Sequence, residues 1–275
     1  MEPLQAILLG IIQGLTEFLP VSSSGHLVIF QHLFGLKEPE LFFDISVHLG
    51  TLAAVIIFFW KEIRAIIIAI LRFAGMYFKK EVSFSHIYED IDTKLAFLIV
   101  VGTIPTAILG LLFHKVADLI FSSVVLVGFM LLLTGFLLFG TRWVKKKVGE
   151  GVEHFSIKDA LIIGLMQGIA IIPGISRSGS TIAVGLLLGL NRETAAKYSF
   201  LLSIPAILGA GVLGLKDISA YPAFTLKASL IGTFTSCIVG YSALRLLVYI
   251  VKKGRIHIFA PYCWFAGLMA LMLQL

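Results

Sequence analysis

The sequence predicts an all-α integral membrane protein with six transmembrane helices and two re-entrant helix–turn–helix hairpins, arranged as an inverted-topology repeat. Hydrophobic residues make up 58% of the 275-residue chain and charged residues only 14%, whereas soluble domains have about 45–50% and about 25%. The apolar runs are long and lack the alternating pattern of barrel strands. In addition, residues 10–25 resemble residues 164–179.

Six apolar segments are long enough to cross a bilayer as helices, which takes roughly 20 residues. Because lysine and arginine are almost absent inside these segments, each is predicted to be one span. The predicted spans are residues 41–60, 95–113, 119–141, 197–215, 225–250 and 257–275.

Two further apolar regions, residues 5–34 and 158–190, are interrupted in the middle by proline, glycine and serine. Each half has roughly 12 to 15 residues, which at about 1.5 Å per residue is too short to span the bilayer. We therefore predict that both regions are re-entrant hairpins. Residues 62–78 are typical of an amphipathic helix that lies at the membrane interface.

The positions of lysine and arginine indicate how the chain is oriented. Sixteen of the 22 lie in or beside the segments 61–94, 142–158, 192–197 and 252–255, which the predicted spans place on one side. The positive-inside rule makes that side cytoplasmic, so both termini are predicted outside and one hairpin enters from each face. This placement accounts for the net charge of +6, and we predict no nucleic-acid partner.

An internal repeat matches this inverted arrangement. The stretch "GIIQGLTEFLPVSSSG" (10–25) aligns with "GLMQGIAIIPGISRSG" (164–179), with the same spacing from glutamine to the final glycine. We predict a single membrane domain, 1–275, built from repeat 1 (1–141) and repeat 2 (158–275). The alternative is a chance match of helix breaks, but the paired Gln-Gly and the opposite orientations argue against it. Transporters build substrate sites where such inverted broken helices meet.

The first hairpin carries a carboxylate and an imidazole at membrane depth, where ionisable residues are costly and point to function. Gln13 and Glu17 share one helix face because they are four residues apart. Pro20 ends that helix, and His26 begins the next. A carboxylate that orients an imidazole is typical of acid–base or nucleophilic chemistry. The intervening serines are Ser22, Ser23 and Ser24, and helix capping is the alternative role for each.

The second hairpin has the composition of an anion site. Its turn, "PGISRSGST" (173–181), places Arg177 at the start of a half-helix among hydroxyl side chains, which are Ser176, Ser178, Ser180 and Thr181. Free backbone N–H groups, a guanidinium and hydroxyl donors together favour phosphate. The alternative is that Arg177 is only the structural partner of Glu17.

If the hairpins pack antiparallel, the two turns form one site. We predict Glu17, His26, Ser23 and Arg177 as catalytic residues. The predicted phosphate-binding residues are Ser176, Arg177, Ser178, Thr181, Ser24 and Gln13. Asp44 and His48 share a face at the outer end of the first span, and we interpret them as structural, although they lie where they could extend the site. A transported anion would need the phosphate cradle but not His26 and Glu17.

These motifs resemble the undecaprenyl-diphosphate phosphatase family of bacterial inner membranes, the bacitracin-resistance type. The family's E/Q-G-x-T/S-E-F-L-P-V/I-S-S-S/T-G-H motif is present as "QGLTEFLPVSSSGH", and its P-G-x-S-R-S-G-x-T motif as "PGISRSGST". The likeness extends over essentially the whole chain. Gln13 stands where the family often has glutamate, which places the carboxylate chemistry on Glu17. Phosphatidic-acid phosphatases of type 2 share only fragments, since Ala183 replaces their downstream histidine.

The resemblance implies hydrolysis of the lipid carrier's diphosphate to its monophosphate, which recycles the carrier for cell-wall synthesis and confers bacitracin resistance. It implies a long-chain isoprenoid diphosphate as substrate, contact with membrane lipids, and a divalent cation, Mg²⁺ or Ca²⁺, with Glu17 as a ligand. The active-site residues carried over are Glu17, Ser23, His26, Ser176, Arg177 and Thr181. Both termini and the active site are then expected on the periplasmic side.

Four questions stay open at the level of sequence. Either His26 is the nucleophile or acid–base group, polarised by Glu17, or Ser23 is the nucleophile with His26 as its base. A transporter or flippase for an anionic isoprenoid lipid is the rival function. The preferred chain length is undetermined, and the sequence is compatible with a homodimer.

Overall fold

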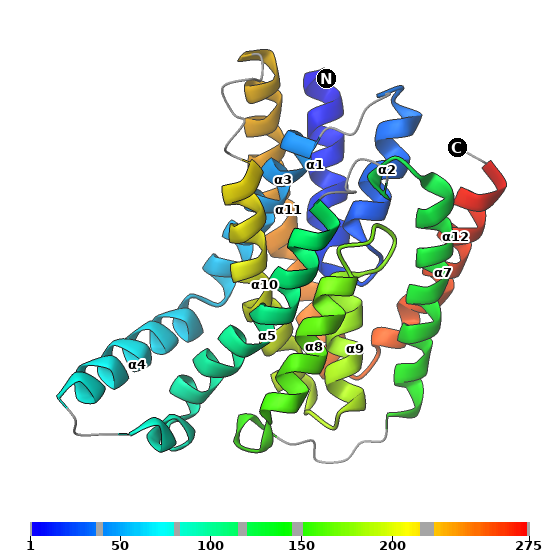
Figure 1. Ribbon diagram of the computed structural model, residues 1–275. Coiled ribbons are helices and arrows are strands. Elements are labelled where there is room, and N and C mark those ends of the chain that lie inside the picture. The colour runs from blue at the N-terminus through cyan, green and yellow to red at the C-terminus, as the bar shows by residue number, and fades with distance from the viewer. Residues whose placement is uncertain are drawn as a thin grey trace.

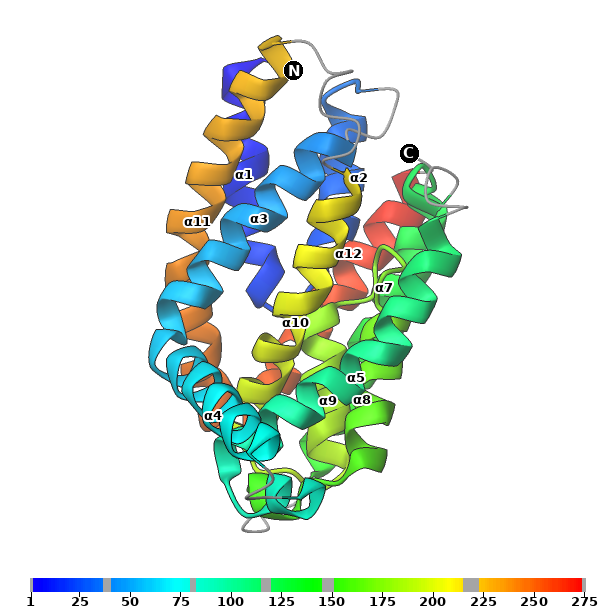
Figure 2. The same ribbon diagram turned by 60° about the vertical axis from the view of Figure 1, so that its left-hand side comes forward.

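The computed structural model describes residues 2–36, 41–79, 83–114, 120–144, 151–214 and 223–273. These residues form helices joined by turns and short loops, and no strand occurs among them. Most of the helices run along one axis of the bundle. The first helix, α1, begins at the same end of the bundle at which the last helix, α12, ends (Figures 1 and 2). The predicted all-α class is confirmed.

The first hairpin consists of α1 (Pro3–Phe18) and α2 (Ser23–Leu33). Proline cannot donate the backbone hydrogen bond that would continue α1, so the helix ends before Pro20. Ser22 then adopts a positive φ of 69° and caps α2 through its side chain. A positive φ is uncommon for a residue with a Cβ and is tolerated where surrounding contacts enforce it.

The second hairpin consists of α8 (Ile157–Ile169) and α9 (Arg177–Leu187). Its turn contains Gly174 with a φ of 99°, a conformation that glycine adopts without steric cost. The predicted helix–turn–helix organisation of both regions is therefore confirmed. The hairpins occupy opposite halves of the bundle, and their turns point toward its middle (Figures 1 and 2).

Each of the six predicted spans overlaps one apolar helix. These helices are α3 (Leu41–Phe58), α5 (Ile91–His114), α7 (Val124–Gly140), α10 (Arg192–Gly214), α11 (Ala223–Lys252) and α12 (Ala260–Leu273). Within the described residues, four segments are long and apolar enough to cross a membrane, namely Ile91–Phe113, Val124–Trp143, Arg192–Val212 and Leu226–Lys252. The helices at 42–58 and 256–272 are apolar but shorter, so a count of six spans stays a prediction.

The remaining elements connect these helices. The predicted amphipathic segment is α4 (Trp60–Phe78), which projects away from the bundle and has one buried residue, Ala69 (Figure 1). Its exposed isoleucines and leucines fit a helix that lies on a membrane surface. The short 3₁₀ turns are η1 (Phe84–Tyr88), η2 (Thr141–Trp143), η3 (Val152–His154) and η5 (Ile256–Phe259).

Glycine residues let the first helix of each hairpin pack closely on a long helix of the other half. Gly10 and Gly14 of α1 face Gly232 and Gly240 of α11, where an added Cβ would meet backbone atoms. At the matching position of α8, Gly164 faces the backbone of α5. Small residues four apart are typical of close helix contacts in membranes. These contacts fix the depth at which the two hairpin turns meet.

We predict that Gly164→Ala destabilises the fold, because its Cβ would overlap the backbone of Gly102. Overpacking of this kind typically costs about 1–3 kcal/mol. The measurement is the thermal unfolding midpoint in detergent. Gly75→Ala in α4 is the matched control, because a Cβ there meets nothing within 4 Å, and its midpoint should not fall. Equal midpoints for both variants would contradict this packing.

Candidate active site

A buried ion pair joins the two hairpins. The Nη2 atom of Arg177, the first residue of α9, donates to Oε1 of Glu17 near the end of α1 at 2.5 Å. The side chains are 16% and 5% exposed. The predicted convergence of the two turns is confirmed, although the residues are 160 positions apart.

Further hydrogen bonds join the two turns around this pair. The backbone N–H of Gly174 donates to the Ser22 Oγ at 3.0 Å, and the Ser178 hydroxyl donates to the carbonyl oxygen of Phe18 at 3.0 Å. Gly25 and Gly174 lie so close that a Cβ on Gly25 would contact the backbone of Gly174. The two turns therefore form one continuous polar unit.

The second carboxylate oxygen of Glu17 has three polar neighbours. Oε2 accepts hydrogen bonds from the Ser23 hydroxyl at 2.5 Å and the Gln13 amide at 3.0 Å. The Nε2 atom of His48, on α3, lies 3.4 Å from the same oxygen. Glu17 thus sits where a proton from Ser23 can be accepted, and Arg177 offsets its charge.

His48 is the residue that sequence reasoning underrated. We interpreted it as structural, yet it reaches the central carboxylate and its side chain is 27% exposed. Its Nδ1 lies 2.7 Å from the carbonyl oxygen of Asp44, and the Asp44 carboxylate accepts from Gln31 at 2.6 Å. The sequence did contain a signal for a functional role of His48, because it is an ionisable residue within a predicted span.

The predicted pairing of Glu17 with His26 is wrong. The His26 Nδ1 lies 2.8 Å from the Ser22 carbonyl oxygen, and its Nε2 lies 2.8 Å from the hydroxyl of Tyr262 on α12. The reason is geometric: His26 lies one turn into α2, where its ring is turned toward α12, whereas Glu17 faces α9 and α3. His26 is still buried beside the site, at 5% exposed.

Most hydroxyl groups of the second turn form hydrogen bonds with backbone groups. The Ser176 side chain caps α9 by accepting from the Gly179 N–H at 3.1 Å. Thr181 bonds the Arg177 carbonyl oxygen at 2.8 Å and the Ser199 hydroxyl at 2.5 Å. Capping, the alternative role that we kept for the serines of the first turn, therefore applies to Ser22, and Ser176 takes the same role in the second turn. Ser24 is half-buried, and its hydroxyl lies 3.4 Å from that of Ser22.

The guanidinium of Arg177 retains one donor for a ligand. Its Nη1 atom is buried and has no hydrogen-bond partner within the described part of the chain. A buried donor without a partner is costly. Arg177 is the first residue of α9, and its partner Glu17 also bonds Ser23, the first residue of α2, so the positive ends of two helix dipoles favour an anion here. The arrangement fits a phosphate oxygen.

The described residues do not fit a divalent cation held by protein side chains alone. No group of three or more His, Cys, Asp or Glu among them could hold a metal ion. The two hairpin turns contain one carboxylate, and both of its oxygens already have partners. The predicted metal role of Glu17 therefore depends on ligands that a substrate would bring.

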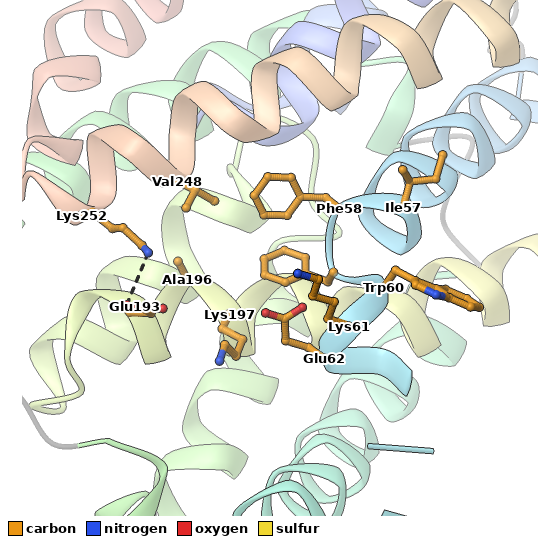
Figure 3. A pocket seen from close by; sticks show the side chains of 11 residues that line it. Ile57, Phe58, Trp60, Lys61, Glu62, Glu193, Ala196, Lys197, Val248 and Lys252 are labelled. Carbon is orange, nitrogen blue, oxygen red and sulfur yellow. Dashed lines mark ion pairs between the residues drawn. The ribbon is translucent and has the colours of Figure 1, made fainter. Parts of the chain in front are cut away.

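A separate cavity of about 520 Å³ lies where the ends of α3 and α11 meet the starts of α4 and α10 (Figure 3). Its walls combine Phe58, Phe59 and Trp60 with lysines and glutamates, and Lys252 pairs with Glu193 at 3.4 Å. None of the residues that line it belongs to the hairpin turns, so it is not part of the candidate active site.

Comparison with known families agrees with the two motifs. The family model described as "Bacitracin resistance protein BacA" matches residues 6–269, which include both hairpins. The chain belongs to this family. Similar proteins named undecaprenyl-diphosphatase include that of Desulforapulum autotrophicum, which is 52% identical over 99% of this chain and 98% of its own length. That of Desulfosudis oleivorans is 52% identical over 97% of each, and that of Desulfatibacillum aliphaticivorans 49% over 99% of each.

Membership in the BacA family confirms the resemblance that the two motifs indicated. The matched region spans every residue that bonds Glu17 and Arg177 in the structure. The individual roles of these residues are taken up as proposals below.

A double-mutant cycle tests the ion pair. Glu17→Leu and Arg177→Leu each leave one charge buried without its partner, and each should lower the free energy of unfolding by about 3–5 kcal/mol. The double variant should lose clearly less than the sum. The control is the exposed Lys252–Glu193 pair, where the coupling should be below about 1 kcal/mol. Additive losses at Glu17 and Arg177 would contradict a direct pair.

Proposed function

We propose that this chain is an undecaprenyl-diphosphatase, which hydrolyses undecaprenyl diphosphate to undecaprenyl monophosphate and inorganic phosphate. The observation that carries the proposal is a hydroxyl bonded to a buried carboxylate beside an arginine with a free Nη1 donor. The activity named for the similar proteins agrees with this chemistry and favours it over a transporter or flippase. Recycling of the lipid carrier and bacitracin resistance follow from the family.

Substrate binding uses the electropositive side of the site. The terminal phosphate lies against Arg177 Nη1 and the N-termini of α2 and α9, which are oriented for an anion before the substrate arrives. We propose that Ser24, Ser178, Gln13, Ser176 and Thr181 line this position, although the Ser178 and Thr181 hydroxyls bond the carbonyl oxygens of Phe18 and Arg177 in this structure. The isoprenoid tail extends between the apolar helices into the membrane.

The chemical step is a displacement at the terminal phosphorus. The Ser23 Oγ attacks that phosphorus while its proton passes to Oε2 of Glu17, and the bond from phosphorus to the bridging oxygen breaks. The lipid monophosphate leaves with the bridging oxygen, and Arg177 stabilises the charge that develops. Water then attacks the phosphoserine, releases inorganic phosphate and restores the Ser23 hydroxyl. The 2.5 Å contact between Ser23 and Glu17 supports this order over a Ser23–His26 pair.

A divalent cation, Mg²⁺ or Ca²⁺, would be held chiefly by the diphosphate. Mg²⁺ is usually bound through one or two carboxylates together with substrate phosphates, and Glu17 is the carboxylate that the hairpin turns offer. The cation would neutralise phosphate charge, and none of the steps above passes through it.

The membrane arrangement is part of the proposal. Each hairpin packs its first helix on a long helix of the other half, which supports the inverted repeat of 1–141 and 158–275. Lys61, Lys197 and Lys252 gather around the cavity of Figure 3, at the end of the bundle opposite the termini. This supports a multi-pass protein of the bacterial inner membrane with both termini and the active site outside.

Removal of the phosphate-binding donor tests the site. Arg177→Ala should lower kcat on the order of 10²-fold or more, because one preorganised donor contributes about 3–4 kcal/mol to the barrier. The assay is release of inorganic phosphate from undecaprenyl diphosphate by purified protein in detergent. Arg245→Ala, an exposed arginine of α11, is the control and should stay within about twofold. Wild-type protein that releases no phosphate would refute the proposed function.

Trapping the covalent intermediate identifies the nucleophile. A rapid acid quench with substrate labelled in its terminal phosphate should give phosphoserine at Ser23, located by peptide mass spectrometry. Ser23→Ala should abolish the label and reduce turnover by about 10³-fold or more, since it removes the attacking atom. Ser242→Ala, on the exposed side of α11, should leave both unchanged. A label on His26 would instead establish the other hypothesis.

A further inference from the structure

The buried imidazole of His26 has a defined tautomer when it is neutral. Its Nδ1 lies 2.8 Å from the carbonyl oxygen of Ser22, and a carbonyl oxygen can only accept. The hydrogen must therefore be on Nδ1, which leaves the lone pair on Nε2. The partner of Nε2 then decides in which direction the basic nitrogen points.

That partner is Tyr262, a residue of α12 that lies outside both hairpins and both motifs. Its hydroxyl lies 2.8 Å from Nε2 of His26, where it donates to the lone pair. The two rings are also stacked, with centroids 5.7 Å apart and planes 9° from parallel. Tyr262 thus restrains the imidazole in two ways, by a directional hydrogen bond and by contact with its face.

The surroundings of Tyr262 show that it is not simply a core residue. The residue is 46% exposed, so its ring covers His26 from the outside and is not enclosed by the bundle. Within the described residues, no hydrogen bond other than that to His26 is recorded for its hydroxyl. A phenylalanine would keep the same ring contact, so packing alone gives no reason for a hydroxyl here.

We propose that Tyr262 is a positioning residue that acts through His26. Its hydroxyl holds the imidazole as the Nδ1–H tautomer with the basic Nε2 in a fixed direction beside the hairpin turns. The consequence for turnover rests on the proposed function and adds a part for His26 to it, since the Ser23–Glu17 step described above does not use the imidazole. The consequence for the tautomer does not depend on the proposed function.

Kinetics of two variants test the proposal. Tyr262→Phe keeps the stacked ring and removes the donor, so kcat should fall about 3- to 10-fold, as expected for one hydrogen bond. The KM and the thermal midpoint should stay unchanged. Tyr262→Leu removes the ring as well and should lower kcat further. Tyr249→Phe is the matched control, because Tyr249 is 61% exposed and lies on α11, and its kcat should equal that of the wild type.

The ring nitrogens report the tautomer without any assay of activity. In protein labelled with ¹⁵N-histidine in detergent micelles, the His26 signals are assigned by their loss in His26→Gln. The wild type should show a protonated Nδ1 and an unprotonated, hydrogen-bonded Nε2. Tyr262→Phe should shift the Nε2 signal toward that of a free nitrogen, while Tyr249→Phe should not.

Three results would overturn the proposal. They are an unchanged kcat in Tyr262→Phe, an unchanged Nε2 signal in that variant, or a rise in KM at constant kcat, which would mean direct contact with substrate. If the wild type releases no phosphate from undecaprenyl diphosphate, the proposed function fails, and the ¹⁵N spectra alone then decide whether Tyr262 positions His26.

Discussion

The ion pair between Glu17 and Arg177 is the interaction on which the site depends. Each charge is buried, and each would be costly at this depth without the other. Because one belongs to α1 and the other to α9, neither hairpin can satisfy its own charge. The contact between the two turns therefore satisfies both charges and also assembles the active site.

Electrostatics explain why we propose an anion at this meeting point. Two half-helices begin at the site, and each contributes free N–H groups and the positive end of its dipole. Arg177 adds a full positive charge, and Glu17 offsets only part of the total. The remaining donor, Nη1 of Arg177, has no partner within the described residues, and we propose that a phosphate oxygen binds it. Close packing at glycine residues holds the helices together although the positive helix ends and Arg177 repel one another.

Reactivity and positioning come from different parts of the chain. The hairpin turns supply the hydroxyl, the carboxylate and the guanidinium, whereas α3 and α12 supply side chains that orient them. His48 approaches Glu17 from α3, and Tyr262 holds His26 from α12. Hydrophobic contacts also hold the first hairpin in place, such as that between Phe18 of α1 and Phe200 of α10, whose ring centroids are 5.8 Å apart. The reactive groups are thus fixed by helices that contain neither motif.

The sequence by itself predicted the two broken hairpins, the helices between them and the convergence of the two turns, and it offered the pairing of Arg177 with Glu17 only as the alternative to an anion site. Proline, glycine and serine mark the breaks, and two buried charges of opposite sign require each other. Only the tertiary structure decided that Glu17 contacts Ser23 and His48, and that His26 turns to Tyr262. The physical reason differs between the two helices. The helix α12 is apolar around nearly its whole circumference, so no polar face shows its rotation in the sequence. On α3 the sequence shows that Asp44 and His48 share a face, but only the packing of the helices brings His48 to Glu17.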